Sequence, residues 1–165
     1  MAALTVGKKA PDFTLTAMDG SKFSLQEALG RGPVVLAFFK ISCPVCQYAF
    51  PYVERIYKTY GGKNVTIVGV SQNEKKDTAK FNQEFGVTFP VLLDDTKSYP
   101  VSNAYGLTNV PTLFWIGQDG EIEISSVGWV RKEMEDIHRR AAETSGDGWK
   151  PLFLSGEQVT DFRAG

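Results

Sequence analysis

The sequence contains little of several residue types that mark particular classes of protein. Its 165 residues include only two cysteines and one histidine, which is too few for the disulfide framework of a small secreted protein. The formal net charge is −1 and the basic residues are spread along the chain, which gives no electrostatic case for a nucleic acid or an anionic membrane as partner. No apolar run approaches the roughly eighteen residues of a membrane-spanning helix.

The first residues, MAALTVGKKAPDF, lack the apolar segment of a secretion signal. We therefore expect a cytoplasmic protein as the sequence stands, or a periplasmic or extracytoplasmic one if a leader has been removed. The length is that of one domain that buries its own core.

Patterns typical of strands and helices alternate along most of the chain. The apolar, β-branched run PVVLAFF predicts a central strand buried on both faces. The alternation predicts a mixed α/β sandwich, with a partly parallel sheet and helices on both of its faces. We assign residues 1–146 to this domain and residues 147–165 to an extended surface tail. The predicted elements are hairpins at 11–25 and 110–128, strands at 33–39, 64–70 and 89–93, and helices at 24–30, 43–60, 73–86, 97–106 (interrupted by Pro100) and 131–146.

Both cysteines lie in one motif, CPVC, which follows the buried strand and opens the next helix. The unpaired N–H groups and the dipole of a first helical turn favour an anion, so they activate Cys43 as a thiolate. Cys46 lies one turn deeper on the same face, where the two sulfurs can join in a small disulfide ring. The motif predicts thiol–disulfide exchange through a mixed disulfide, with Cys43 attacking and Cys46 resolving.

Two other interpretations of the motif are possible. Cys-x-x-Cys is also half of a zinc site, but the chain offers no further cysteine and only His138 as another soft ligand. We expect no metal, and we expect His138, in a polar helical stretch, to face solvent. Two inert core cysteines are the other alternative, although the start of a helix after a buried strand is an unusual place for them.

A second motif is Val110-Pro111-Thr112 at the start of a predicted strand. Proline cannot donate a hydrogen bond to a sheet, so it belongs at an edge or an irregular entry. A cis bond at Pro111 turns the backbone of Val110 outward as an edge for a substrate peptide. A trans proline that merely opens the strand is the alternative. We predict the cis bond, beside Cys43.

Together these residues resemble the thioredoxin superfamily, from about Pro11 to Ala142. CPVC stands at the place of the redox motif, Val110 and Pro111 at the place of the cis-proline, and Pro51 at the place of the proline that kinks the active-site helix. The N-terminal hairpin and an insert over 71–107 resemble the redoxin (AhpC/TSA) branch. That branch holds TlpA/ResA-like thiol–disulfide oxidoreductases and the peroxiredoxins.

The resemblance implies a thioredoxin-like fold and a thiol–disulfide oxidoreductase that exchanges disulfides with a partner protein. It implies no cofactor other than the redox-active pair Cys43–Cys46. The chain departs from the family pattern at three places: Ser42 replaces a tryptophan, Ala37 a buried aspartate, and Ala49 a glutamate. The proton acceptor for Cys46 is therefore unassigned.

The residues around the motif leave the reduction potential open. The intervening pair is Pro44 and Val45, with the proline first, as in the strongly oxidising DsbA-like motif. Lys40 is the nearest ionisable side chain in sequence and favours a Cys43 thiolate if it is close, although a solvated lysine at a strand end is the plainer interpretation. The dipeptide tunes the potential, but the spacing alone gives no value.

The main alternative function is a peroxiredoxin-type peroxidase, a thiol-dependent antioxidant. That branch has Thr or Ser three residues before its peroxide-attacking cysteine and a proline further upstream, and here Lys40 and Leu36 stand at those places. It also has an arginine near the last strands, whereas no arginine lies between Arg55 and Arg131. A redox-inactive binding module with a thioredoxin fold is a further alternative, and the presence of both cysteines argues against it.

Overall fold

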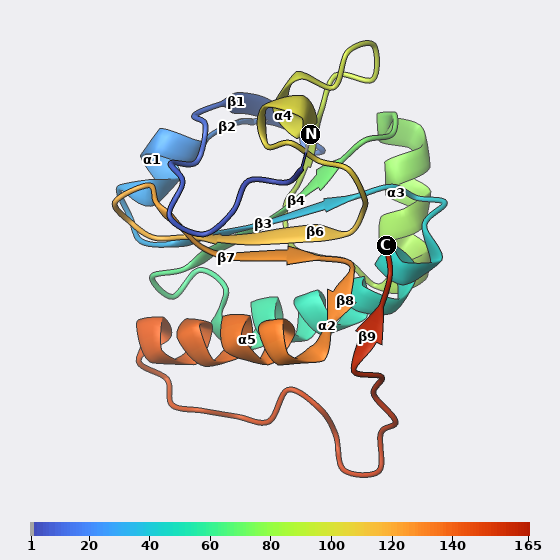
Figure 1. The fold of residues 1–165 in the computed structure, drawn as a ribbon. Coiled ribbons are helices and arrows are strands. Elements are labelled where there is room, and N and C mark those ends of the chain that lie inside the picture. Colours follow the sequence, from blue (N-terminus) through green and yellow to red (C-terminus); the bar gives the residue numbers. More distant parts are fainter. Residues whose placement is uncertain (1) are drawn as a thin grey trace.

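A seven-stranded mixed sheet forms the centre of the molecule in the computed structural model, which describes residues 2–165 (Figure 1). The strand order is β2-β1-β5-β4-β3-β6-β7. Strands β3, β4 and β5 are parallel, while β6 and β7 continue one side of the sheet and β1 and β2 the other side in antiparallel pairing. The strands are β1 (Thr14–Ala17), β2 (Lys22–Ser24), β3 (Val34–Phe39), β4 (Thr66–Ser71), β5 (Val91–Leu93), β6 (Thr112–Ile116) and β7 (Ile122–Val127).

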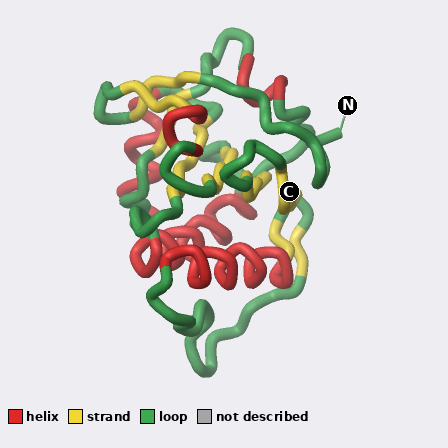
Figure 2. Tube along the Cα trace, turned by 90° about the vertical axis from the view of Figure 1, so that its left-hand side faces the viewer, coloured by secondary structure: helices red, strands yellow, loops and turns green. Residues whose placement is uncertain are grey.

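Helices cover both faces of the sheet, as the alternating pattern predicts. Helices α2 and α5 lie side by side against one face, and α1 and α4 lie on the other (Figures 1 and 2). The α3 helix adds Phe81 to the α2 side, where its ring contacts those of Phe39 and Phe50. The helices are α1 (Leu25–Leu29), α2 (Pro44–Tyr60), α3 (Lys75–Phe85), α4 (Pro100–Ala104) and α5 (Arg131–Ser145).

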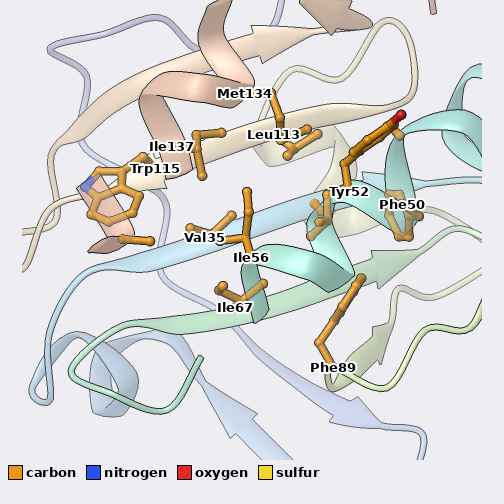
Figure 3. Packing of buried hydrophobic residues seen from close by; sticks show 14 of the residues in the cluster. Val35, Phe50, Tyr52, Ile56, Ile67, Phe89, Leu113, Trp115, Met134 and Ile137 are labelled. Atoms are coloured by element: carbon orange, nitrogen blue, oxygen red, sulfur yellow. The ribbon is translucent and has the colours of Figure 1, made fainter. Parts of the chain in front are cut away.

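The central strand β3 explains why the chain needs an uninterrupted apolar run. All six of its residues are buried. Because successive side chains of a strand point to opposite faces, Val35, Ala37 and Phe39 join the core under α2 and α5, whereas Val34, Leu36 and Phe38 join the core under α1 and α4. The close-up in Figure 3 shows the first core, with side chains of α2 and α5 directed at the sheet.

The predicted sandwich, both hairpins and the main helices are confirmed. Ser24 caps α1 by accepting the N–H of Glu27, as the sequence predicts. The helix predicted over 97–106 begins only at Pro100, which occupies its first turn and does not interrupt it. Proline is favoured there because its missing N–H has no partner in a first turn. Within residues 2–165, no helix is long and apolar enough to cross a membrane.

The expectation that His138 faces solvent is wrong. Its side chain is buried, and its ring lies 5.5 Å from that of Tyr60 and 5.8 Å from that of Trp149. Burial lowers the pKa of His138, so the neutral ring is favoured. His138 shares the buried face of α5 with Met134, Ile137 and Ala141, and this spacing of three and four residues was visible in the sequence.

A second, two-stranded sheet was not predicted. It joins β8 (Trp129–Val130) to β9 (Phe162–Arg163) near the end of the tail. After α5 the tail runs along the helices and returns to the end of the molecule where β8 begins (Figure 1). Two-residue strands carry no periodic pattern, so only the tertiary structure brings them together.

Candidate functional site

Cys43 is the N-cap residue of α2. Its backbone is extended, and its Sγ accepts the N–H of Cys46 at 3.1 Å. Pro44 follows in the first turn, where a missing N–H costs nothing. The sulfur therefore lies at the positive end of the helix dipole, on a first-turn N–H that has no partner within the helix. Cys43 is half-buried, and it lines a surface cavity.

Cys46 has the opposite surroundings. It is fully buried, in the core cluster that also contains Phe39 and Phe50. Burial, and next its contact with Cys43, raise the pKa of the Cys46 thiol well above the ordinary range. Both cysteines are free thiols in this structure. The motif thus places one accessible sulfur above one protected, protonated sulfur.

The loop between β3 and α2 is fixed from two sides. The N–H of Ile41 donates to the side chain of Asn73 at 2.9 Å, and the carbonyl of Ile41 accepts from Gln47 at 3.0 Å. Asn73 follows β4, the parallel neighbour of β3, and Gln47 lies one residue after Cys46. These two amides hold the loop that aims Cys43, and no sequence motif marks them.

The Val110–Pro111 peptide bond is cis and lies beside the motif, as predicted. The carbonyl oxygen of Val110 accepts a hydrogen bond from the Cys43 Sγ at 3.3 Å. Pro111 itself is buried, and Thr112 begins β6, which pairs with β3. The start of β6 is thereby placed directly against the start of α2.

A cavity of about 470 Å³ opens beside the accessible sulfur. Of the residues singled out in the sequence, Cys43, Lys40, Pro44 and Val110 line it, with Lys40 exposed to solvent. Ser42 is exposed and Val45 is half-buried, and neither lines the cavity. The remaining lining residues are Gln72, Tyr99, Ser102, Asn103, Leu107, Thr108, Asn109 and Gly165.

Buried side chains joined by hydrogen bonds form one wall of the cavity, and the sequence analysis does not predict them. Ser102 donates its hydroxyl hydrogen to the buried carboxylate of Asp94 at 2.7 Å, so its oxygen accepts from the Gln72 amide at 3.0 Å. Asp94 also accepts the N–H of Ser102 at 2.8 Å. This network fixes the orientation of Gln72 beside the cavity. The sequence marks Gln72 only by its position. Gln72 directly follows β4, so it lies at the same edge of the sheet as the cysteine motif.

The buried acid of α2, Glu54, lies two turns beyond Cys46 and is engaged elsewhere. Its carboxylate accepts the N–H and the hydroxyl of Thr88 and the N–H of Phe89, at 2.8 Å and 3.3 Å for the two N–H groups. These bonds hold the loop before β5 against α2. Glu54 therefore stabilises the fold. Among the described residues, no carboxylate forms a hydrogen bond with the Cys46 thiol.

Comparison with known proteins agrees with this geometry. The model of the AhpC/TSA family matches residues 6–125. The thiol-disulfide oxidoreductase ResA of Geobacillus kaustophilus is 37% identical over 138 residues, which are 83% of this chain and 76% of that protein. ResA of Halalkalibacterium halodurans is 33% identical over 129 residues, which are 78% of this chain and 72% of that protein.

Solved structures confirm the thioredoxin-like fold. A thiol:disulfide interchange protein of the thioredoxin family from Chlorobium tepidum has a TM-score of 0.68 and 25% identity, covering 84% of this chain and 99% of that one. The thioredoxin domain of a thiol-disulfide oxidoreductase from Bacteroides vulgatus has a TM-score of 0.74 at 22% identity, covering 84% and 98%. The second likeness concerns the fold alone.

Proposed function

This chain belongs to the AhpC/TSA family and is a thiol–disulfide oxidoreductase of the thioredoxin type, and on that premise we propose that Cys43 is its attacking and Cys46 its resolving thiol. One observation carries the assignment. Cys43 is accessible at the helix N-terminus and accepts a backbone N–H, while Cys46 is fully buried three residues further on.

In the reducing direction, the Cys43 thiolate attacks one sulfur of a partner disulfide, the partner's S–S bond breaks, and its other sulfur leaves as a thiolate. Cys46 then loses its proton and attacks the Cys43 Sγ, so the mixed disulfide breaks and the second partner sulfur leaves. Two electrons have passed to the partner, whose two thiols take up the protons that the cysteines released. A dithiol reductant then restores the pair.

The partner is a protein that carries a disulfide or a dithiol, and the edge at Val110 is its proposed docking place. The cavity beside Cys43 gives the approaching sulfur room, and Gln72 offers a fixed amide in its lining. We propose that the cysteine pair is the only redox group required. The direction of exchange follows from its potential relative to that of the compartment. A reducing compartment keeps the pair reduced, so that it donates electrons to partner disulfides, whereas an oxidising compartment keeps it oxidised, so that it takes electrons from partner dithiols.

Peroxidase activity is the second candidate function, since the family branch includes peroxiredoxins. The residues around Cys43 do not favour it. Lys40, exposed to solvent, stands where a peroxidase has Thr or Ser, and buried Leu36 stands where it has a proline. We therefore rank protein disulfide exchange above peroxide reduction.

Two parallel assays test the proposed function. The reduced protein should reduce insulin disulfides in the presence of a dithiol reductant, and Cys43→Ser should lose that turnover. The same protein should consume hydrogen peroxide slowly. Rapid peroxide consumption with formation of a sulfenic acid on Cys43, without insulin turnover, would reverse the ranking of the two functions. Absence of both activities would indicate a binding module.

A further inference from the structure

The tail reaches the place proposed for the partner. From residue 147 it runs along α5 and α2, and its last segment, β9, pairs antiparallel with β8 (Figures 1 and 2). The pairing sets Phe162 opposite Val130 and Arg163 opposite Trp129. The segment 162–165, which we name the strap, thus lies on a strand edge that faces the active-site end of the molecule.

The strap is placed next to the redox helix by side chains as well as by the backbone. The guanidinium of Arg163 lies over the ring of Tyr48, 4.7 Å from its centroid. The hydroxyl of Tyr48 accepts the N–H of Thr160 at 3.2 Å, and the indole N–H of Trp129 donates to the carbonyl of Thr160 at 2.7 Å. Tyr48 comes two residues after Cys46 on α2, so Arg163 of the strap and Thr160 just before it both contact the helix that carries the two thiols.

The strap ends against the backbone of the cis-proline loop. A methyl group on Gly165 would lie 2.4 Å from the carbonyl oxygen of Val110, and one on Gly128 would lie 2.6 Å from the carbonyl oxygen of Arg163. The side chain of Asn109 donates to the carbonyl of Gly165 at 3.1 Å. Val110 is the residue whose carbonyl contacts the Cys43 Sγ. The strap therefore occupies the backbone edge that the proposed function assigns to a partner.

Residues 147–160 of the tail have anchors that do not involve the strap. Leu152 is buried in the α2–α5 core, and the hydroxyl of Tyr60 bonds the backbone of Gly148 and of Lys150. Arg55 pairs with both carboxylate oxygens of Glu157 at 2.7 Å. By contrast all four strap residues are exposed, and Phe162 retains 62% of its surface. A short, exposed segment beyond firm anchors is able to leave its place while the fold stays intact.

We propose that the strap is a stand-in for the partner, which binds by displacing it. This rests on the proposed function. The partner presents an extended segment that pairs with the edge of β8, lies against Val110 and Gly128, and places a basic side chain over Tyr48, as Arg163 does. Main-chain hydrogen bonds supply general affinity in such strand addition, and side-chain positions supply specificity. Stacking on the tyrosine ring favours arginine or lysine at one position of the partner.

Removing the strap tests its displacement. A chain that ends at Thr160 keeps Leu152, Glu157 and Thr160, and it should reduce insulin faster than the full chain. Labelling of Cys43 by iodoacetamide, a reagent too small to need the edge, should change far less. A truncated chain that reduces insulin at the full-chain rate or more slowly would overturn the proposal.

A point variant repeats the test without shortening the chain. Arg163→Ala removes the contact with Tyr48 and should raise the rate of insulin reduction about twofold to fivefold, the range expected from one exposed cation–π contact. Arg139→Ala is the matched control, because it removes the same charge from the exposed face of α5. Equal rates for the two variants would contradict a role for Arg163 at the edge.

A binding measurement separates this proposal from the proposed function. A fluorescent peptide of sequence DFRAG should bind the chain ending at Thr160 with both cysteines replaced by serine, which removes all thiol chemistry. The peptide DFAAG should bind about twofold to fivefold more weakly. Binding without insulin turnover by any form would support the strap and refute the exchange activity. Absence of binding to a folded truncated chain would refute the strap.

Discussion

Cys43 and Cys46 lie one helical turn apart, yet their surroundings are opposite. Cys43 caps α2, is only half-buried and accepts a backbone N–H. Cys46 is fully buried against Phe50 and its neighbours, and burial raises the pKa of its thiol. On the proposed function, the two cysteines take different roles because one lies at the surface of the first helical turn and the other is buried beneath it.

The tail shows a parallel contrast between its two parts. Residues 147–160 are tied to the core by Leu152 and by the Arg55–Glu157 ion pair, whereas the strap lies exposed across the backbone at Val110. Burial marks the parts of this molecule that must stay in place. On the proposed function, the exposed strap is the part that the partner displaces.

We expect the largest effect from a substitution that removes the packing around the buried Cys46 thiol. Phe50 lies one turn after Cys46, is fully buried, and its ring centroid is 4.4 Å from that of Phe39. Phe50→Ala should lower the free energy of unfolding by about 3–5 kcal/mol and make Cys46 reactive toward iodoacetamide in the native state. Lys58→Ala on the exposed face of α2 is the control, with a change within about 0.5 kcal/mol. Protection of Cys46 that survives Phe50→Ala would show that packing does not shield it.

A smaller effect follows from the raised pKa of Cys46. The native state keeps this proton at pH values where the unfolded thiol has lost it, so the stability is fully present below about pH 8.5 and falls as pH rises. The slope should approach about 1.4 kcal/mol per pH unit above that value. Urea unfolding of the reduced protein between pH 8 and 10 measures it. Cys46→Ala should flatten the decline, and an unchanged slope in that variant would contradict the assignment.

The smallest effect is expected at Lys40. Lys40→Thr restores the residue type that peroxiredoxins carry at this place, but buried Leu36 and the missing arginine remain. Peroxide consumption should stay at the wild-type level, with Lys58→Thr as the control for loss of one charge. A large gain in peroxide consumption from this single change would mean that the site is close to a peroxidase.

Much of the site could be predicted because its signals are local. The Cys-x-x-Cys spacing, the strand before it and the proline at position 111 follow one another within short stretches of sequence, and local rules describe each. The sandwich also follows from alternating periodicities. The fixed amides of Gln72 and Asn73 could not be found in this way, because their partners Ser102 and Ile41 are about thirty positions away.

The tail illustrates the same limit. Its glycines and proline suggest an extended surface segment, but β9 exists only because β8 offers it an edge. The prediction that His138 faces solvent failed for a different reason, because its spacing from Met134 and Ile137 already indicates the buried face of α5. The polar composition of this helix suggests an exposed histidine, whereas the spacing of its apolar residues correctly indicates a buried one.

The most direct test of the account is the fate of the mixed disulfide. Cys46→Ser should leave the attack by Cys43 intact and remove the resolving sulfur, so a covalent adduct with a disulfide-bearing protein should accumulate. A non-reducing gel would detect the adduct, and mass spectrometry would locate the bond on Cys43. Cys43→Ser should form no adduct under the same conditions. Accumulation of adducts by Cys43→Ser, or faster labelling of Cys46 than of Cys43 by iodoacetamide at neutral pH in the wild-type protein, would contradict the division of roles.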